Sequence, residues 1–313
     1  MQNFKRNLLL SLAGIMVVFI VATMMLLGVG LASYSGGTED EKEEPELVAE
    51  VEEPELEPEP ESEPEPEEPK VTDFQNVINS WVWSLKGAKV AVMMYDLDND
   101  VYVGKVNADT SFDSASLYKL VVAYAGYLMR EKGEIKGDMY LTGGRTINEC
   151  LDAAVRSSNS ACGEALRRYI GAEKLSEFLT KWGMESTDLY NIRTTAGDMV
   201  ALLKVMYKHE GLSTKTWAEI QDSMLNQPKS EGLCGEEKIC NWRAGLPSGF
   251  SSGVKVYDKV GWLSKDGESW ELYHDVAILE FPSGQHYAIA VLTSDATLVQ
   301  IRDLAKKIEQ GVK

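Results

Sequence analysis

The chain is poor in positive charge, in histidine and in cysteine. Its 313 residues include 31 Lys and Arg against 49 Asp and Glu, with three His, four Cys and a net charge of −18. Nucleic-acid binding needs a basic surface that neutralises phosphates, so we expect no nucleic-acid partner. No Cys-x-x-Cys pair occurs, a spacing common in thiolate metal sites, and we expect neither a metal nor another cofactor.

The acidic residues are concentrated in one segment. Residues 38–69 hold seventeen Asp or Glu, one Lys and seven Pro, including Glu-Pro repeats. This segment carries sixteen of the net negative charges, so the rest of the chain is nearly neutral. Like charges repel one another and proline favours extended geometry. We therefore expect residues 36–71 to form a disordered stalk, with an acidic interaction tail as the alternative.

A long apolar run precedes the stalk. Residues 8–32 contain no charge, and a helix of that length spans about 37 Å, enough to cross a bilayer core of about 30 Å. Lys5 and Arg6 precede the run and acidic residues follow it, which predicts a cytoplasmic N-terminus. Residues 1–35 are thus predicted to be a short tail and a single transmembrane anchor in the cell membrane. Cleavage of the run and a buried core helix are the alternatives.

The four cysteines all lie in the segment that follows the stalk. Their even number and the expected extracytoplasmic location favour disulfides. Cys234 with Cys240 would close a short loop, and Cys150 with Cys162 is the companion pair. Two other pairings are possible.

Beyond residue 72 the sequence patterns change from strands to helices and back to strands. Residues 90–95 and 101–103 flank a predicted turn at 98–100, as in a β-hairpin, and helical periodicity fills residues 114–226. This order excludes a repeated strand-helix-strand series. It predicts an α+β fold, with an antiparallel sheet of about five strands from both chain ends, packed by helices, and an inserted all-helical lobe. The other expected elements are a helix at 77–85, strands at 253–262, 270–281 and 286–293, and a helix at 296–310.

The segment Ser116-Leu117-Tyr118-Lys119 places a hydroxyl and an amine three residues apart, before an apolar run at 120–129. On a helix the two side chains share one face. A lysine can take the proton of a serine if burial or a nearby cation lowers the pKa of its amine. The alternative is a helix N-terminus with a surface lysine.

Two further segments fit as partners of that pair. Residues 157–159 (Ser-Ser-Asn) lie between helical stretches, and residues 259–261 (Lys-Val-Gly) lie on the first C-terminal strand. The order S-x-x-K, S-x-N and K-x-G, on helix, loop and strand, resembles the class A β-lactamases and penicillin-binding proteins. The resemblance covers residues 72–313 and implies a β-lactamase/transpeptidase-like fold. Segments 112–115, 170–183, 194–199 and 244–249 extend it.

The resemblance implies a catalytic role for four side chains. Ser116 would attack an amide carbonyl and become acylated, with Lys119 as the proton acceptor. Ser157 would pass the proton to the leaving nitrogen. Lys259 would add positive charge for this relay and for a substrate carboxylate.

Three further residues would bind the substrate. By resemblance, Asn159 would hold Lys119 and the amide of the substrate side chain, and Gly261 belongs to the strand motif at the substrate. The backbone N–H groups of Ser116 and Trp262 would stabilise the oxyanion.

Two departures from the family pattern bear on the reaction. Class A β-lactamases carry a glutamate, on a long loop, that positions the water for hydrolysis of the acyl-enzyme, but only ten residues separate Gly183 from Thr194 here. Glu185 and Asp188 in this segment do not match the expected E-x-x-x-N. Val260 stands where Thr or Ser is usual, which removes a hydrogen bond worth about 1.5 to 3 kcal/mol to a charged acceptor.

We therefore expect a monomeric serine hydrolase domain that faces the cell wall and is acylated by β-lactams or by D-Ala-D-Ala-type stem peptides of peptidoglycan. Its release of the acyl group is expected to be slow. The alternative is a catalytically impaired relative that binds peptidoglycan or another envelope component. A Gly-x-Ser-x-Gly motif at residues 249–253 would suit an α/β-hydrolase only on a strand-to-helix turn, and a strand follows it here.

Overall fold

The computed structural model describes residues 71–234, 237–264 and 271–312, without the side chains of residues 229–241. The predicted membrane anchor and nearly all of the predicted stalk lie outside these ranges and stay predictions. Within the described ranges, no helix is both long enough and apolar enough to cross a membrane.

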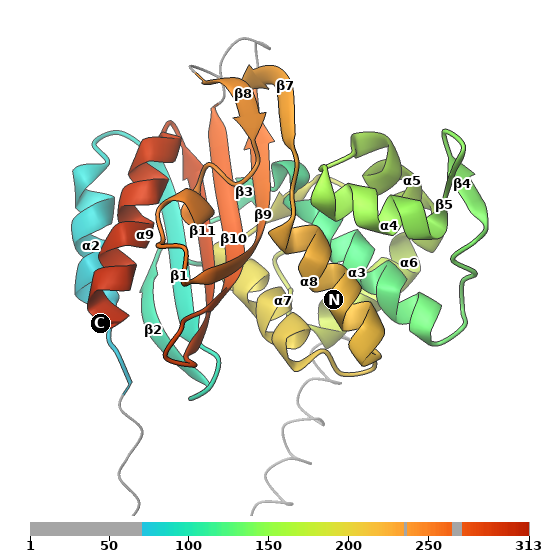
Figure 1. Ribbon diagram of the computed structural model, residues 1–313, viewed down its shortest axis with the longest axis horizontal. Coiled ribbons are helices and arrows are strands. Elements are labelled where there is room, and N and C mark those ends of the chain that lie inside the picture. Colours follow the sequence, from blue (N-terminus) through green and yellow to red (C-terminus); the bar gives the residue numbers. More distant parts are fainter. Residues whose placement is uncertain (1–70, 235–236, 265–270, 313) are drawn as a thin grey trace, which may run out of the picture. The chain divides into compact units, whose positions relative to one another are not determined.

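A five-stranded antiparallel sheet forms the centre of the domain (Figure 1). Its strands are β1 (Lys89–Asp96), β2 (Val101–Val106), β9 (Lys255–Leu263), β10 (Leu272–Glu280) and β11 (His286–Ser294). Their order is β2-β1-β11-β10-β9, so β1 pairs with the last strand and β9 lies at an edge. The predicted sheet, built from both ends of the domain, is confirmed.

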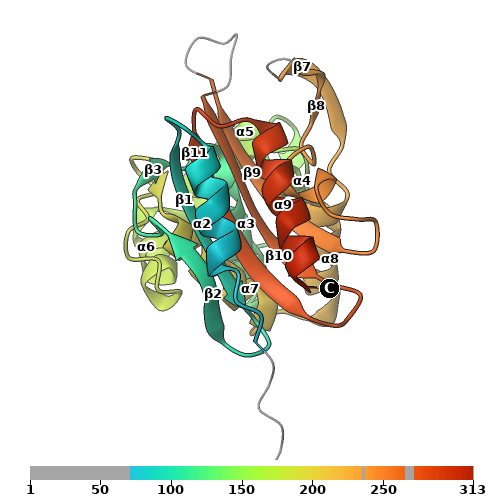
Figure 2. The ribbon, with the colours of Figure 1, turned by 90° about the vertical axis from the view of Figure 1, so that its left-hand side faces the viewer.

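Two helices, α2 (Gln75–Ser84) and α9 (Leu298–Val312), lie side by side over one face of the sheet (Figure 2). The buried Trp81 joins them, because its indole Nε1 donates to the carbonyl of Gln300 at 2.7 Å. Apolar side chains of these helices pack against every second residue of the strands, as the pleat of a β-strand requires. The helices predicted at both ends of the domain are thus confirmed.

The opposite face of the sheet packs against a lobe of helices, as predicted. These are α3 (Tyr118–Glu131), α4 (Ile147–Arg156), α5 (Ser160–Ile170), α6 (Ala172–Lys181), α7 (Ala196–Lys208) and α8 (Thr214–Leu225). Every residue of α3 from Lys119 to Leu128 is buried, so this helix is the centre of the lobe. The long apolar run after Ser116 therefore correctly predicted a buried helix.

Several short strands were not predicted. The hairpin of β7 (Lys229–Cys234) and β8 (Glu237–Asn241) has no alternation of apolar and polar residues that would reveal it. Strands β4 (Tyr140–Thr142) and β5 (Arg145–Thr146) form a second pair. Strand β3 (Phe112–Asp113) pairs with β6 (Arg193–Thr194), which joins the segment before Ser116 to the end of the short 184–193 loop.

Candidate active site

Ser116 lies at a bend immediately before α3. It is half-buried in the short 3-10 turn η1 (Ala115–Leu117). Ala115 has a φ of 45°, in the left-handed region that is unfavourable for L residues. The carboxylate of Asp113 accepts a hydrogen bond from the N–H of Ala115 at 2.8 Å and holds this bend. Backbone strain of this kind is typical of functional sites.

Lys119 is 2% exposed and its amine faces Ser116. Its Nζ donates to the hydroxyls of Ser116 and Ser160, both at 2.9 Å, and to the carbonyl of Ser158 at 2.6 Å. Among the described residues, no carboxylate bonds to this amine, and burial lowers the pKa of Lys119 to about 8. Gly163 makes room for the lysine stem, since a Cβ there would lie 2.7 Å from Cγ of Lys119.

Ser158 connects two lysines. Its Oγ accepts a hydrogen bond from Nζ of Lys259 at 2.9 Å, and Nζ of Lys119 lies 3.4 Å away. Its φ of 53° is a second left-handed, non-glycine conformation at the site. The hydroxyl of Ser158 therefore lies where a proton could pass between the two amines.

This geometry moves the predicted S-x-N motif by one residue, from Ser157 to Ser158. Helix α4 ends at Arg156, and the hydroxyl of Ser157 turns back to donate to the carbonyl of Ala153 at 3.0 Å. The side chain of Asn159 caps α5, where it accepts a hydrogen bond from the N–H of Cys162 at 2.9 Å. The side chains of Ser157 and Asn159 thus hydrogen-bond to the backbone at the end of α4 and at the start of α5. Ser158 and Ser160 contact the lysines, and both were missed.

Lys259 is completely buried on β9. Its Nζ also donates to the carbonyl of Val260 at 2.7 Å, and burial together with the nearby Lys119 lowers the pKa of Lys259 well below its usual value. Gly261 allows β9 to approach the turn that carries Ser116. A Cβ at this position would lie 2.8 Å from the carbonyl oxygen of Ser114 and 2.8 Å from Cγ of Leu117.

The side chain of Val260 lies in an apolar cluster. It is 1% exposed and packs with Ala244, Trp262 and Leu298. Because strand side chains alternate, this cluster is on the opposite side of β9 from Lys259. Valine at this position avoids the cost of about 1 to 3 kcal/mol that an unpaired buried hydroxyl would carry. The role of the Trp262 backbone N–H stays a prediction.

A buried acidic pair behind β9 was not predicted. Asp258 of β9 and Asp275 of β10 are both 0% exposed. Arg243 Nη1 bonds to Asp258 at 2.6 Å, and the N–H of Leu246 donates to Asp275 at 2.7 Å. Burial raises the pKa of Asp258 to about 7 and that of Asp275 well above its usual value. Both carboxyls favour a proton on the nearby Lys259.

The two acids of the short 184–193 loop make no hydrogen bond to Ser116. The carboxylate of Asp188 accepts hydrogen bonds from the N–H groups of Tyr190 and Asn191 in its own turn, and Glu185 is exposed. The loop is fixed by Asp198 of α7, which accepts a hydrogen bond from the hydroxyl of Thr187 at 2.7 Å. Within the described ranges, no carboxylate hydrogen-bonds to Ser116.

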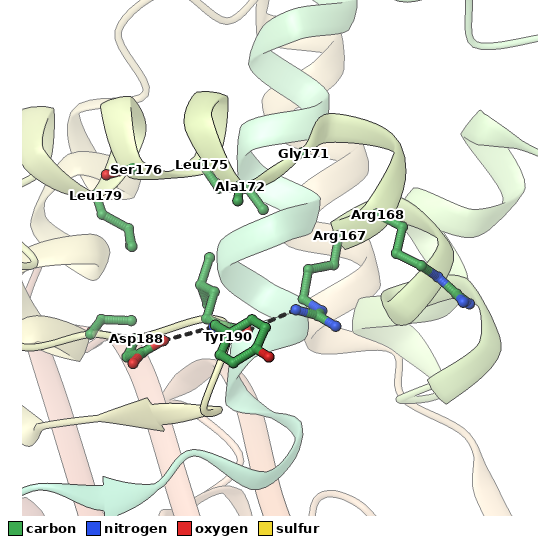
Figure 3. A pocket seen from close by; sticks show the side chains of 11 residues that line it. Arg167, Arg168, Gly171, Ala172, Leu175, Ser176, Leu179, Asp188 and Tyr190 are labelled. Atoms are coloured by element: carbon green, nitrogen blue, oxygen red, sulfur yellow. Dashed lines mark hydrogen bonds between the residues drawn. The ribbon is translucent and has the colours of Figure 1, made fainter.

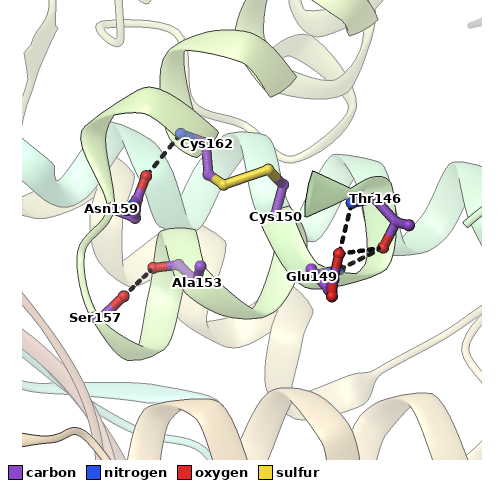
Figure 4. Close-up of a disulfide and its surroundings, with 7 residues drawn as sticks. All are labelled: Thr146, Glu149, Cys150, Ala153, Ser157, Asn159 and Cys162. Atoms are coloured by element: carbon purple, nitrogen blue, oxygen red, sulfur yellow. Dashed lines mark hydrogen bonds between the residues drawn. A yellow bond between two sulfur atoms is a disulfide. The ribbon is translucent and has the colours of Figure 1, made fainter. Parts of the chain in front are cut away.

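One of the two predicted disulfides is present. Cys150 of α4 and Cys162 of α5 are joined, with their Cα atoms 4.8 Å apart (Figure 4). The side chains of Cys234 and Cys240 lie outside the described part of the structure, so their pairing stays a prediction.

A separate cavity of about 390 Å³ lies between α5, α6 and the short loop (Figure 3). Leu175 and Leu189 contribute apolar walls, and Arg167 and Tyr190 also line it. None of the serines and lysines described above lines this cavity, so it is distinct from the candidate active site.

The sequence profile of the Beta-lactamase enzyme family matches residues 72–312. The chain belongs to this family. No curated protein sequence matches the chain. Within the β-lactamase family the loop motif is S-D-N, so Ser158-Asn159-Ser160 is its counterpart here, and a serine occupies the last position.

Solved structures of β-lactamases share the fold. The TLA-1 extended-spectrum β-lactamase has a TM-score of 0.62 at 23% identity, over 76% of this chain and 98% of its own. A class A β-lactamase from Bacteroides cellulosilyticus has a TM-score of 0.64 at 18% identity, over 78% and 99%. A PBP-A variant in its acyl-enzyme complex with penicillin G has a TM-score of 0.63 at 17% identity, over 76% and 96%.

The amine of Lys119 is expected to titrate near pH 8, because burial disfavours its charged form. Lysine labelled with carbon-13 and followed by NMR against pH would give the midpoint. Loss of the signal in Lys119→Gln would assign it. A midpoint at the ordinary lysine value of about 10.4 would contradict the geometry of a buried amine.

Proposed function

We propose that the domain is an active-site serine hydrolase that forms an acyl-enzyme on β-lactams or on D-Ala-D-Ala-type stem peptides of peptidoglycan. The observation that carries this proposal is the distance of 2.9 Å between Nζ of Lys119 and Oγ of Ser116. Such a contact is within hydrogen-bond reach of a nucleophile and its general base.

Proton transfer begins at Lys119. With a pKa of about 8, part of the population carries a neutral amine at neutral pH, and that form accepts the hydroxyl proton of Ser116. The oxygen then attacks the carbonyl carbon, and the predicted oxyanion donors are the backbone N–H groups of Ser116 and Trp262. The proton returns through Ser158 to the amide nitrogen. The C–N bond breaks and leaves an ester on Ser116.

Hydrolysis of this ester is proposed to be slow. It needs a water activated by a base, and the acids of the short loop are occupied elsewhere. Asp188 is bound within its own turn and Glu185 is exposed. The PBP-A variant in its acyl-enzyme complex with penicillin G provides an example of such an ester on this fold.

Incubation with penicillin G should add the mass of one intact penicillin molecule to the protein. The adduct is expected to persist because a deacylating base is missing from the short loop. Intact-mass measurement over time would follow it, and digestion would locate it on Ser116. Ser116→Ala is the control and should stay unmodified. Rapid turnover without an adduct would contradict slow hydrolysis, and no reaction would favour the alternative of a catalytically impaired binding module.

The neighbouring serines 157 and 158 form a matched pair of variants. Ser158→Ala should slow acylation by about a hundredfold or more, because the relay between the amines and the leaving nitrogen is lost. Ser157→Ala should change it little, since among the described residues that hydroxyl bonds only to the carbonyl of Ala153. Stopped-flow labelling with a fluorescent penicillin would measure both rates. If Ser157→Ala slowed acylation more than Ser158→Ala, the role of Ser157 predicted from the sequence would be supported instead.

We also propose that residues 8–32 anchor the chain in the cell membrane and that the acidic stalk holds the domain outside the cytoplasm. The support is the uncharged run, the basic residues before it and the acidic segment after it. This arrangement would place the serine near the cell wall.

Cell fractionation tests the anchor. The full chain should sediment with membranes and resist extraction with salt, because an uncharged and mostly apolar run of 25 residues holds it in the bilayer. Protease added to cells whose wall has been removed should release the domain. A domain protected from protease in intact spheroplasts would contradict the proposed orientation.

A further inference from the structure

We propose that the Cys150–Cys162 disulfide is a positioning element of the active site, which fixes Ser158 between Lys119 and Lys259. This inference rests on the proposed function. It assigns to the disulfide a role in the geometry of the reaction, in addition to its contribution to stability.

The disulfide spans the loop that carries Ser158. Helix α4 ends at Arg156 and α5 begins at Ser160, so three residues connect the two helices. The disulfide bonds α4 to the first turn of α5, and both sulfur-bearing side chains are completely buried (Figure 4). The cross-link therefore fixes the distance between the two ends of the loop.

Cys162 has a second link to the same loop. Its backbone N–H donates to the side chain of Asn159 at 2.9 Å, so the cross-linked residue also forms the cap of α5. On the other side, the carbonyl of Ala153 accepts hydrogen bonds from the N–H of Ser157 at 3.2 Å and from the N–H of Asn159 at 3.0 Å. Both ends of the loop are thus bound to the helices that the disulfide joins.

Ser158 needs such support. Its φ of 53° is unfavourable for a serine and persists only where the surroundings determine it. In this conformation one residue contacts both amines, through its carbonyl to Lys119 and through its hydroxyl to Lys259. A change in the spacing of α4 and α5 would release both contacts together.

The surroundings of Lys119 indicate how loss of its contact with Ser158 would change the pKa of its amine. The amine of Lys119 faces Lys259 of β9, whose pKa it lowers, and the ring of Tyr118 lies 5.9 Å from Nζ of Lys119. On α5, Glu164 faces Tyr118. With Ser158 displaced, water would reach the amine, so the pKa of Lys119 would rise toward its usual value. Acylation would then become slower at neutral pH and would require a higher pH.

The test compares the full chain with its Cys150→Ala/Cys162→Ala variant, in detergent micelles and below the unfolding temperature of both. Acylation by a fluorescent penicillin at neutral pH should slow by about tenfold to a hundredfold. The pH profile of the rate and the NMR midpoint of Lys119 should both move to higher pH. If the variant does not fold, the wild-type chain reduced under native conditions replaces it.

Leu304→Ala is the matched control for stability. Leu304 is fully buried on α9, in the core on the other face of the sheet, so the variant is destabilised without a change in the loop. It should keep the acylation rate and the Lys119 midpoint of the wild type. A purely stabilising disulfide would give the same result in the cysteine variant.

Two outcomes separate this inference from the proposed function. An unchanged Lys119 midpoint and an unchanged rate in the folded cysteine variant would overturn the positioning role. A wild-type chain that is never acylated, with a midpoint that still moves in the variant, would overturn the proposed reaction and support the positioning of the lysine.

Discussion

Burial of the Lys119 amine is the interaction on which the site depends. Its hydrogen-bond partners are the hydroxyls of Ser116, Ser158 and Ser160 and the carbonyl of Ser158, so the amine is held in place without an opposite charge. Desolvation of an amine is unfavourable for the ammonium form, and a neutral amine is the form that can accept a proton. The central position of α3 supplies the burial, and Gly163 supplies the space for the stem.

The second amine, that of Lys259, comes from the sheet and has different surroundings. Lys259 is as deeply buried, but behind its strand lie Asp258 and Asp275, and the ionised form of either carboxyl opposes the loss of the lysine proton. Gly261 then lets this edge strand approach the turn of Ser116. The lobe and the sheet therefore each contribute one lysine, and Ser158 is the point where their contributions meet.

Sequence patterns predicted the main elements of the fold. They did not predict which side chains of the α4–α5 loop contact the lysines, because that depends on the residue at which α4 ends. Apolar segments on either side of a turn marked the first strands, and the apolar run after Ser116 marked the buried helix, so the fold and the Ser116–Lys119 pair followed. Ser157 and Ser158 are adjacent and identical, and only the end of α4 determines which one turns toward the lysines. The acidic pair behind β9 could not be recognised either, because charged residues in a strand usually indicate a solvent-exposed face.

The short 184–193 loop shows how this fold can separate two halves of a reaction. Its anchors are Asp198 with Thr187, and the pairing of β3 with β6, none of which contacts the amines. The side chains proposed for acylation come instead from η1, α3, the α4–α5 loop and β9. On the proposed mechanism, the loop can therefore lack a base while its C-terminal end still supports the turn of Ser116, because the N–H of Ser114 donates to the carbonyl of Ile192 at 2.7 Å. In the proposed reaction, acylation depends on the buried lysines, whereas hydrolysis depends on a loop that supports the turn of Ser116 but, among the described residues, makes no hydrogen bond to either amine.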